Sequence, residues 1–127
     1  APPVARDVPR PLGGGPCHWI AAGPVEEGRV VLWLHGGAFL SGSGRTHGAM
    51  LARLAKLART EVACPDYRLL QQAPFPAAFD DALAAWEGLR RLGYAPGRVA
   101  LGGDSAGGGL ALALLAALLA REERPAA

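Results

Sequence analysis

Short apolar runs alternate along the chain with longer segments in which apolar residues recur at helical spacing. The runs at 29–34, 61–65 and 98–102 hold few polar side chains, which is typical of strands buried on both faces. The segments at 46–59 and 76–92 place leucine and other apolar residues three or four positions apart. We therefore predict strands at 17–22, 29–34, 61–65 and 98–102, and helices at 46–59, 76–92 and 110–120.

This alternation of strands and helices predicts the α/β class, with a mostly parallel sheet covered on both faces. We expect residues 17–127 to form part of one domain, with 17–22 as an edge strand. The proline- and glycine-rich residues 1–16 are expected to form an irregular lead-in. Because ligand sites of such sheets lie at the carboxyl ends of the strands, the residues that follow each strand are the candidates for function.

The last predicted strand runs into Gly103-Asp104-Ser105-Ala106-Gly107, and a helix follows. A Gly-x-Ser-x-Gly turn between a strand and a helix is the arrangement that presents a nucleophilic serine. Gly103 and Gly107 are needed because a Cβ at either position would collide across the tight turn. We predict Ser105 as the nucleophile, Asp104 as a support of the turn, and the Ala106 amide as a donor to an oxyanion.

A second glycine motif, His35-Gly36-Gly37-Ala38, follows the second predicted strand. A His-Gly-Gly loop in this position supplies backbone N–H donors to an oxyanion in lipases and esterases. We expect the amides of Gly36, Gly37 and Ala38 to form the oxyanion hole and His35 to brace the loop. Both motifs come directly after a strand, so the sequence places them at the same edge of the sheet.

Four short motifs follow one another in the region from about residue 29 to residue 120. They are His35-Gly-Gly-Ala-Phe39, Asp66-Tyr-Arg-Leu69, Pro74-Phe-Pro-Ala-Ala78 with Asp81, and Gly102-Gly-Asp-Ser-Ala-Gly-Gly108. In this order they resemble the hormone-sensitive-lipase-like branch of the α/β-hydrolases. The resemblance implies a three-layer α/β-hydrolase fold, here incomplete on its C-terminal side, and hydrolysis of carboxylic esters. Ala38 stands where the branch usually has a third glycine, but a backbone N–H donor survives that change.

A serine nucleophile needs a histidine to take its proton and an acid to orient that histidine. In the resembled fold both follow the serine along the chain. After Ser105 this chain offers only Glu122 and Glu123 as acids, and no histidine. We therefore expect the catalytic acid and histidine to lie beyond the end of this chain. The chain itself would then be the N-terminal part of a longer hydrolase. Of the histidines present, we interpret His18 as a surface residue and His47 as a disfavoured candidate base.

The sequence thus predicts a carboxylesterase- or lipase-type serine hydrolase that acts on a small-molecule ester without a cofactor. Two alternatives stay open, namely a non-catalytic small-molecule binder on the same scaffold and another serine hydrolase such as a peptidase or thioesterase. The strand at 99–101 would lack its usual neighbour at the sheet edge. We expect the isolated 127 residues to be poorly soluble or molten, and essentially inactive.

Composition and charge narrow the set of partners. The net charge is +2 and the arginines are scattered, so we predict neither a nucleic-acid nor a membrane surface. The histidines and cysteines lack metal-ligand spacing, which predicts no metal site. Cys17 and Cys64 give no disulfide framework, and Cys64 is expected to be buried in its strand.

Reduced thiols and the lack of an apolar signal segment favour a cytoplasmic protein, and no oligomeric state is favoured. Without an initiator methionine, the chain is expected to begin inside a longer protein.

Overall fold

The computed structural model describes residues 6–35, 48–66, 75–104 and 106–127. Each predicted strand and helix is found there, with ends that differ from the prediction by a few residues. In chain order the elements are β1 (Arg6–Pro9), β2 (Cys17–Ala21), β3 (Val30–Leu34), α1 (Gly48–Ala58), β4 (Glu61–Pro65), α2 (Phe75–Arg91), the 3-10 helix η1 (Pro96–Arg98), β5 (Val99–Gly103) and α3 (Ala106–Ala120).

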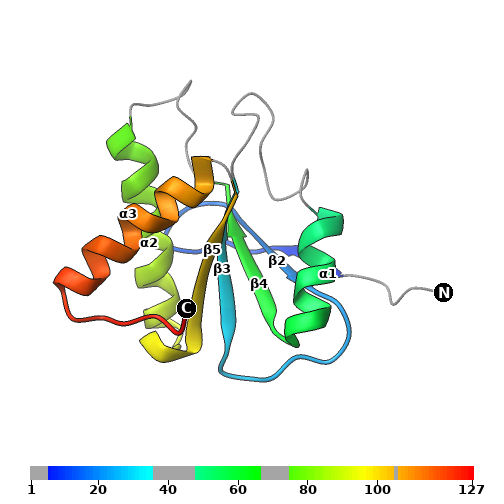
Figure 1. The fold of residues 1–127 in the computed structure, drawn as a ribbon. Coiled ribbons are helices and arrows are strands. Elements are labelled where there is room, and N and C mark those ends of the chain that lie inside the picture. The colour runs from blue at the N-terminus through cyan, green and yellow to red at the C-terminus, as the bar shows by residue number, and fades with distance from the viewer. Residues whose placement is uncertain (1–5, 36–47, 67–74, 105) are drawn as a thin grey trace.

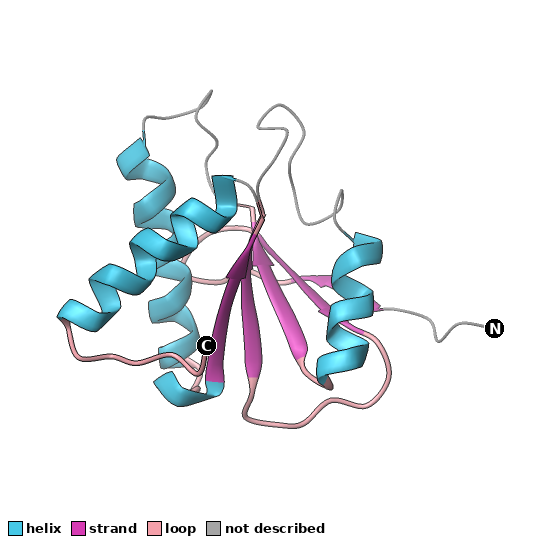
Figure 2. Ribbon diagram, viewed as in Figure 1, coloured by secondary structure: helices cyan, strands magenta, loops and turns pink. Residues whose placement is uncertain are grey.

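The five strands form one sheet in the order β1-β2-β4-β3-β5. β3 pairs in parallel with β4 on one side and with β5 on the other, whereas β1 and β2 add antiparallel pairings at the far edge. The arrows of β3, β4 and β5 therefore end at the same edge of the sheet (Figure 2). This is the edge at which the sequence predicts a functional site.

Helices cover both faces of the sheet, which makes the three-layer arrangement of the predicted fold class (Figure 1). α1 lies on one face against β2 and β4, and α2 and α3 lie on the other, with α3 against β3 and β5. Two separate apolar clusters result, one on each face. The larger cluster joins α2 and α3 to the sheet through Trp86, Leu89, Leu114 and Leu118, all of them fully buried.

The N-terminal part of the sheet differs from the prediction. Arg6–Pro9 forms the strand β1 instead of irregular chain, and β2 lies inside the sheet rather than at its edge. All four residues of β1 are exposed, and they include the poor strand formers Asp7 and Pro9. Pairing with β2 stabilises this segment, and proline is tolerated because β1 is the edge strand.

The outer edge of β5 is covered by the last residues of the chain. The Ala126 amide donates a hydrogen bond of 2.8 Å to the Val99 carbonyl, and the Leu101 amide donates one of 2.8 Å to the Ala127 carbonyl. No strand of the described residues pairs with this edge, as predicted, but its backbone groups at 99 and 101 are not left open. The tail therefore supplies what a neighbouring strand would otherwise supply.

Unlike the two amphipathic helices, α3 is apolar on every side. Leu110, Leu114 and Leu118 are buried, while Leu112 is 68% exposed. Within the described part of the chain, α3 and the other helices are too short or too polar to cross a membrane.

The turn between β1 and β2 packs tightly against α2. Gly13 has a φ of 63°, and a Cβ on it would overlap the Ala84 carbonyl group. A Cβ on Gly88 would lie 2.7 Å from the Gly13 amide nitrogen and 2.9 Å from Leu12 Cδ1. These contacts connect the antiparallel edge of the sheet to α2.

We expect Gly88→Ala to destabilise the full-length protein by about 1–3 kcal/mol, because the added methyl group forces the turn away from α2. Gly97→Ala is the matched control, since a Cβ at Gly97 has no atom within 4 Å. It should change the free energy of unfolding by less than about 0.5 kcal/mol. Urea denaturation measures both variants, and equal stabilities would contradict the packing described.

Candidate active site

The carboxyl ends of β3 and β5 lie side by side at the edge of the sheet. In the parallel register, Trp33 is the partner of Gly102 and Leu34 is the partner of Gly103. His35 and Asp104, the next residues along the two strands, therefore leave the sheet at the same level. Segments that lie about 70 positions apart in sequence thus meet at one place.

Gly103 and Gly107 approach each other across the turn between β5 and α3. A Cβ on Gly103 would overlap the Gly107 carbonyl group and would lie 2.9 Å from the Gly108 amide nitrogen. The Gly107 amide donates a hydrogen bond of 2.9 Å to the Asp104 carbonyl, which closes the turn around position 105. Only a residue without a side chain fits at Gly103, in agreement with the tight strand–turn–helix interpretation.

Gly107 also sets the distance between α3 and β3. A Cβ on Gly107 would overlap the Leu34 carbonyl oxygen and would lie 2.7 Å from the carbonyl carbon and oxygen of His35. The first turn of α3 is therefore in backbone contact with the residues that lead into the His-Gly-Gly motif. His35 itself is 1% exposed, so its ring lies inside the protein beneath this edge.

A side-chain hydrogen bond from β3 also holds the turn between β5 and α3. The Trp33 indole Nε1 donates to Asp104 Oδ1 at 3.1 Å, and the two residues lie 71 positions apart in sequence. The sequence predicts Asp104 as a support of the turn but does not reveal this partner. Trp33 stands in an apolar strand, and only the register with Gly102 brings its ring to β5.

The predicted catalytic groups themselves lie mostly outside the described residues. Ser105, Gly36, Gly37 and Ala38 belong to that set, as does His47. Ala106 is the first residue of α3. Amides in the first turn of a helix have no acceptor within the helix and can bind an anion, so the Ala106 amide is in a position suited to the predicted role.

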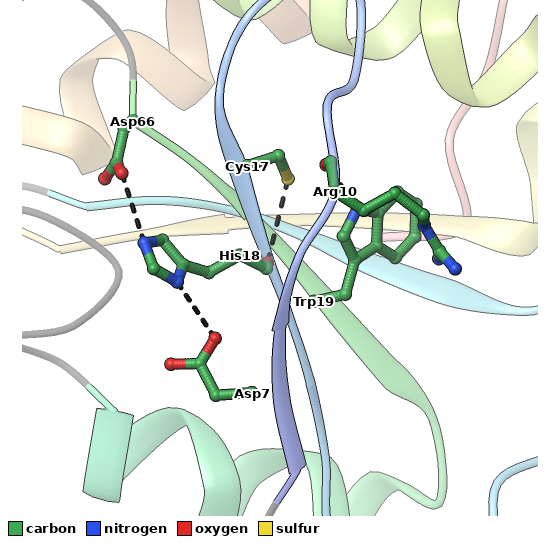
Figure 3. A network of polar contacts seen from close by, with 6 residues as sticks. All are labelled: Asp7, Arg10, Cys17, His18, Trp19 and Asp66. Atoms are coloured by element: carbon green, nitrogen blue, oxygen red, sulfur yellow. Dashed lines mark hydrogen bonds and ion pairs between the residues drawn. The ribbon is translucent and has the colours of Figure 1, made fainter.

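His18 is not the surface residue that we predicted. It lies on β2 with its side chain 14% exposed, and its ring lies between two carboxylates (Figure 3). Nδ1 is 2.9 Å from Asp7 Oδ1, and Nε2 is 3.2 Å from Asp66 Oδ2. β1, which the sequence did not predict, brings Asp7 to the ring. With a carboxylate at each ring nitrogen, His18 serves to join β1 and β2 to the end of β4 and is not available as a base for Ser105.

The same corner holds Arg10 against β2. The Arg10 guanidinium lies 4.2 Å from the centre of the Trp19 ring, and the Trp19 indole donates a hydrogen bond of 2.9 Å to the Arg10 carbonyl (Figure 3). The stacked cation and the hydrogen bond fix the segment between β1 and β2.

The acids that follow Ser105 lie at the far end of α3. Fifteen helical residues separate them from the turn, roughly 22 Å at 1.5 Å per residue. Glu123 accepts a hydrogen bond of 3.0 Å from the Trp86 indole and pairs with Arg121. The Trp86 hydrogen bond and the arginine charges lower the pKa of Glu123, although some burial opposes this. Glu123 therefore joins the end of α3 to α2 and does not reach a histidine at the turn.

The two cysteines are buried and belong to different faces of the sheet, as their separate apolar clusters show. Burial raises the pKa of Cys17 to about 12 and also raises the pKa of Cys64, so neither is a reactive thiolate near neutral pH. The prediction of Cys64 as a buried small residue is confirmed.

The described ranges contain no cluster of histidine, cysteine or acidic residues that could hold a metal ion.

A cavity of about 330 Å³ lies next to the end of β4. Its described lining comes from the turn 12–16, from Pro65 and Asp66, and from Asp81 of α2. None of these described lining residues belongs to β3 or β5.

Known proteins match this chain in sequence and in fold. Residues 31–127 match the family model of the alpha/beta hydrolase fold. An acetyl-hydrolase of Streptomyces hygroscopicus is 46% identical over 93 residues, which are 73% of this chain and 31% of that protein. Esterase LipU of Mycobacterium tuberculosis is 46% identical over 99 residues, which are 78% of this chain and 33% of that protein. A crystal structure of an esterase from the bacterial hormone-sensitive lipase family has a TM-score of 0.90 and 45% identity, and the match covers 96% of this chain and 41% of that one.

The chain belongs to the α/β-hydrolase fold family. The relatives named above are an acetyl-hydrolase and an esterase, and the match to the esterase structure places the chain in the hormone-sensitive-lipase-like branch that the sequence motifs resemble. The chain spans about a third of the length of the curated relatives that it matches.

The contact between α3 and β3 can be tested with two alanine substitutions in the first turns of α3. We expect Gly107→Ala to lower the free energy of unfolding by about 1–3 kcal/mol, because the new Cβ overlaps the Leu34 carbonyl. Gly109→Ala should instead stabilise the protein by up to about 1 kcal/mol, because alanine favours helix and a Cβ there has no atom within 4 Å. Urea denaturation of the full-length protein measures both. A Gly107→Ala variant as stable as Gly109→Ala would show that the backbones do not approach in this way.

Proposed function

We propose that the protein to which these residues belong is a serine carboxylic-ester hydrolase with Ser105 as its nucleophile. The observation that supports this most strongly is the packing of the turn around position 105. Gly103 and Gly107 leave no space for side chains, and Gly107 contacts the backbone from which the His-Gly-Gly motif begins. A tight strand–turn–helix beside such a loop is an arrangement that serves nucleophilic attack on a carbonyl group.

In the proposed reaction, Ser105 Oγ attacks the ester carbonyl carbon while a histidine accepts the hydroxyl proton. The carbonyl π electrons move to oxygen, and the amides at 36–38 and at Ala106 stabilise the resulting oxyanion. Collapse of this intermediate breaks the bond to the alcohol, which leaves with the proton from the histidine. Water then attacks the acyl-serine in the same way and releases the carboxylic acid. The loss of one oxyanion donor typically costs about 100- to 1000-fold in rate.

The histidine and the acid that orients it are proposed to lie in a part of the protein that follows residue 127. His18 is held by two carboxylates, and the acids at the end of α3 lie roughly 22 Å from the turn by helix length alone. The greater length of the relatives is in keeping with a domain that continues.

The proposed substrates are esters of small carboxylic acids, such as acetyl esters. The name acetyl-hydrolase of the Streptomyces hygroscopicus relative supports this choice. A cytoplasmic location stays a prediction, which cell fractionation with an antibody against the protein would test.

We expect the full-length protein to react covalently with a fluorophosphonate probe and to hydrolyse p-nitrophenyl acetate in preference to peptide and thioester substrates. Ser105→Ala should abolish both labelling and turnover, because the substitution removes the attacking oxygen. The isolated 127-residue chain should be inactive, since the loss of a triad base costs on the order of 10⁶-fold in rate, as it does in subtilisin.

Several outcomes would contradict the proposed function. A folded full-length protein that binds esters without labelling or turnover would be a non-catalytic binder. Preferred turnover of peptides or thioesters would identify another serine hydrolase. Labelling that persists in Ser105→Ala would exclude Ser105 as the nucleophile.

A further inference from the structure

We propose that Trp33 is a positioning residue that orients the Ser105 nucleophile through its hydrogen bond to Asp104. The inference rests on the proposed function, because it needs Ser105 to be the attacking group. Trp33 lies on β3, away from the turn in sequence, and no sequence motif connects it with the reaction.

The position of the Trp33 ring follows from strand register. Trp33 on β3 is the direct partner of Gly102 on β5, so the two residues face the same side of the sheet. A Cβ on Gly102 would lie 2.6 Å from Trp33 Cε3 and 2.7 Å from Cζ3. The indole therefore lies across β5 in the space that the missing side chain leaves. Side chains two positions apart on a strand share a face, which places Asp104 next in line on that side.

The ring is held by the core on the α1 face of the sheet. It packs against the buried cluster formed by Ile20, Leu51, Ala55, Val62 and Cys64. From this fixed position, Nε1 donates to Asp104 Oδ1 at 3.1 Å. Asp104 precedes Ser105 directly in the chain, so the direction of its side chain and the orientation of the nucleophile's backbone are coupled.

The two sides of the turn are thus held in different ways. On the α3 side, the contact of Gly107 with Leu34 and His35 sets how far the helix can approach β3. On the α1 side, the indole hydrogen bond holds the Asp104 side chain at the end of β5. Both supports come from β3, the strand that also leads into the predicted oxyanion loop. Loss of the hydrogen bond would release the Asp104 side chain, and with it the residue that precedes Ser105, without breaking the pairing of β3 with β5.

A second tryptophan offers a matched comparison. The Trp86 indole donates to Glu123 Oε2 at 3.0 Å, which is the same kind of bond, but it joins α2 to the end of α3 far from the turn. If the Trp33 bond only stabilised the fold, its loss would resemble the loss of the Trp86 bond. If it positions Ser105, its loss would also slow the attack by the serine.

The experiment compares Trp33→Phe with Trp86→Phe in the full-length protein. Each substitution keeps an aromatic ring and removes the indole N–H. We expect Trp33→Phe to lower kcat for p-nitrophenyl acetate by about 10- to 100-fold with little change in KM, because a small displacement of a reacting group has effects of this size. The rate of fluorophosphonate labelling should fall by the same factor. Trp86→Phe should lower the Tm but leave kcat and labelling unchanged.

Variants at Asp104 test the bond from its acceptor side, without a change in the core. Asp104→Asn keeps an acceptor for the indole and should retain most of the activity, whereas Asp104→Ala should reproduce the loss seen in Trp33→Phe. The double variant Trp33→Phe/Asp104→Ala should be no worse than either single variant, because the same interaction is removed in each.

The proposal is wrong if Trp33→Phe and Asp104→Ala keep wild-type kcat and labelling rates, or if their losses are fully additive. Should Trp33→Phe fail to fold, the Asp104 pair decides the matter, and equal activities of Asp104→Asn and Asp104→Ala would overturn the proposal. A wild-type protein with neither turnover nor labelling would instead refute the proposed function, so the two failures are distinguishable.

Discussion

The arrangement of the site depends on the contact between the backbone of α3 and the last residues of β3. Gly107 lies against the carbonyl groups of Leu34 and His35 at a distance that excludes any side chain. This contact brings the start of a helix, where the amides have no acceptor within the helix, to the end of the strand that leads into residues 36–38. The pairing of β3 with β5 and the hydrogen bond from Trp33 to Asp104 hold the same two segments together.

The rest of the fold keeps this contact in place. α3 begins with glycines that weaken a helix by about 1 kcal/mol each in an interior position. The burial of Leu114 and Leu118 offsets that cost, because each buried leucine contributes about 1.5–3 kcal/mol. At the other end of α3, Glu123 joins the helix to Trp86 of α2, and the chain then returns to cover the edge of β5. The helix is thus attached at both ends, which limits how far its first turn can move.

The sequence was sufficient for the parts of the fold that depend on local pattern. The apolar runs that became β3 and β4 and the glycine spacing around Ser105 are visible in the chain itself, because burial and tight turns require particular residue types. β1 was missed because its residues are exposed and poor strand formers, so its formation depends on pairing with β2. The contact of His18 with Asp7 was missed for the same reason, because Asp7 lies on β1. The bond between Trp33 and Asp104 could not be predicted because it depends on the register of β3 with β5, and no property of a single strand reveals that register.

The most direct test is a crystal structure of the full-length protein after reaction with a small alkyl phosphonate. The account predicts a covalent bond from phosphorus to Ser105 Oγ. It also predicts a phosphoryl oxygen within about 2.7–3.1 Å of amide nitrogens from both residues 36–38 and Ala106. A phosphonate bound to another residue, or a phosphoryl oxygen that faces away from either of these segments, would contradict it.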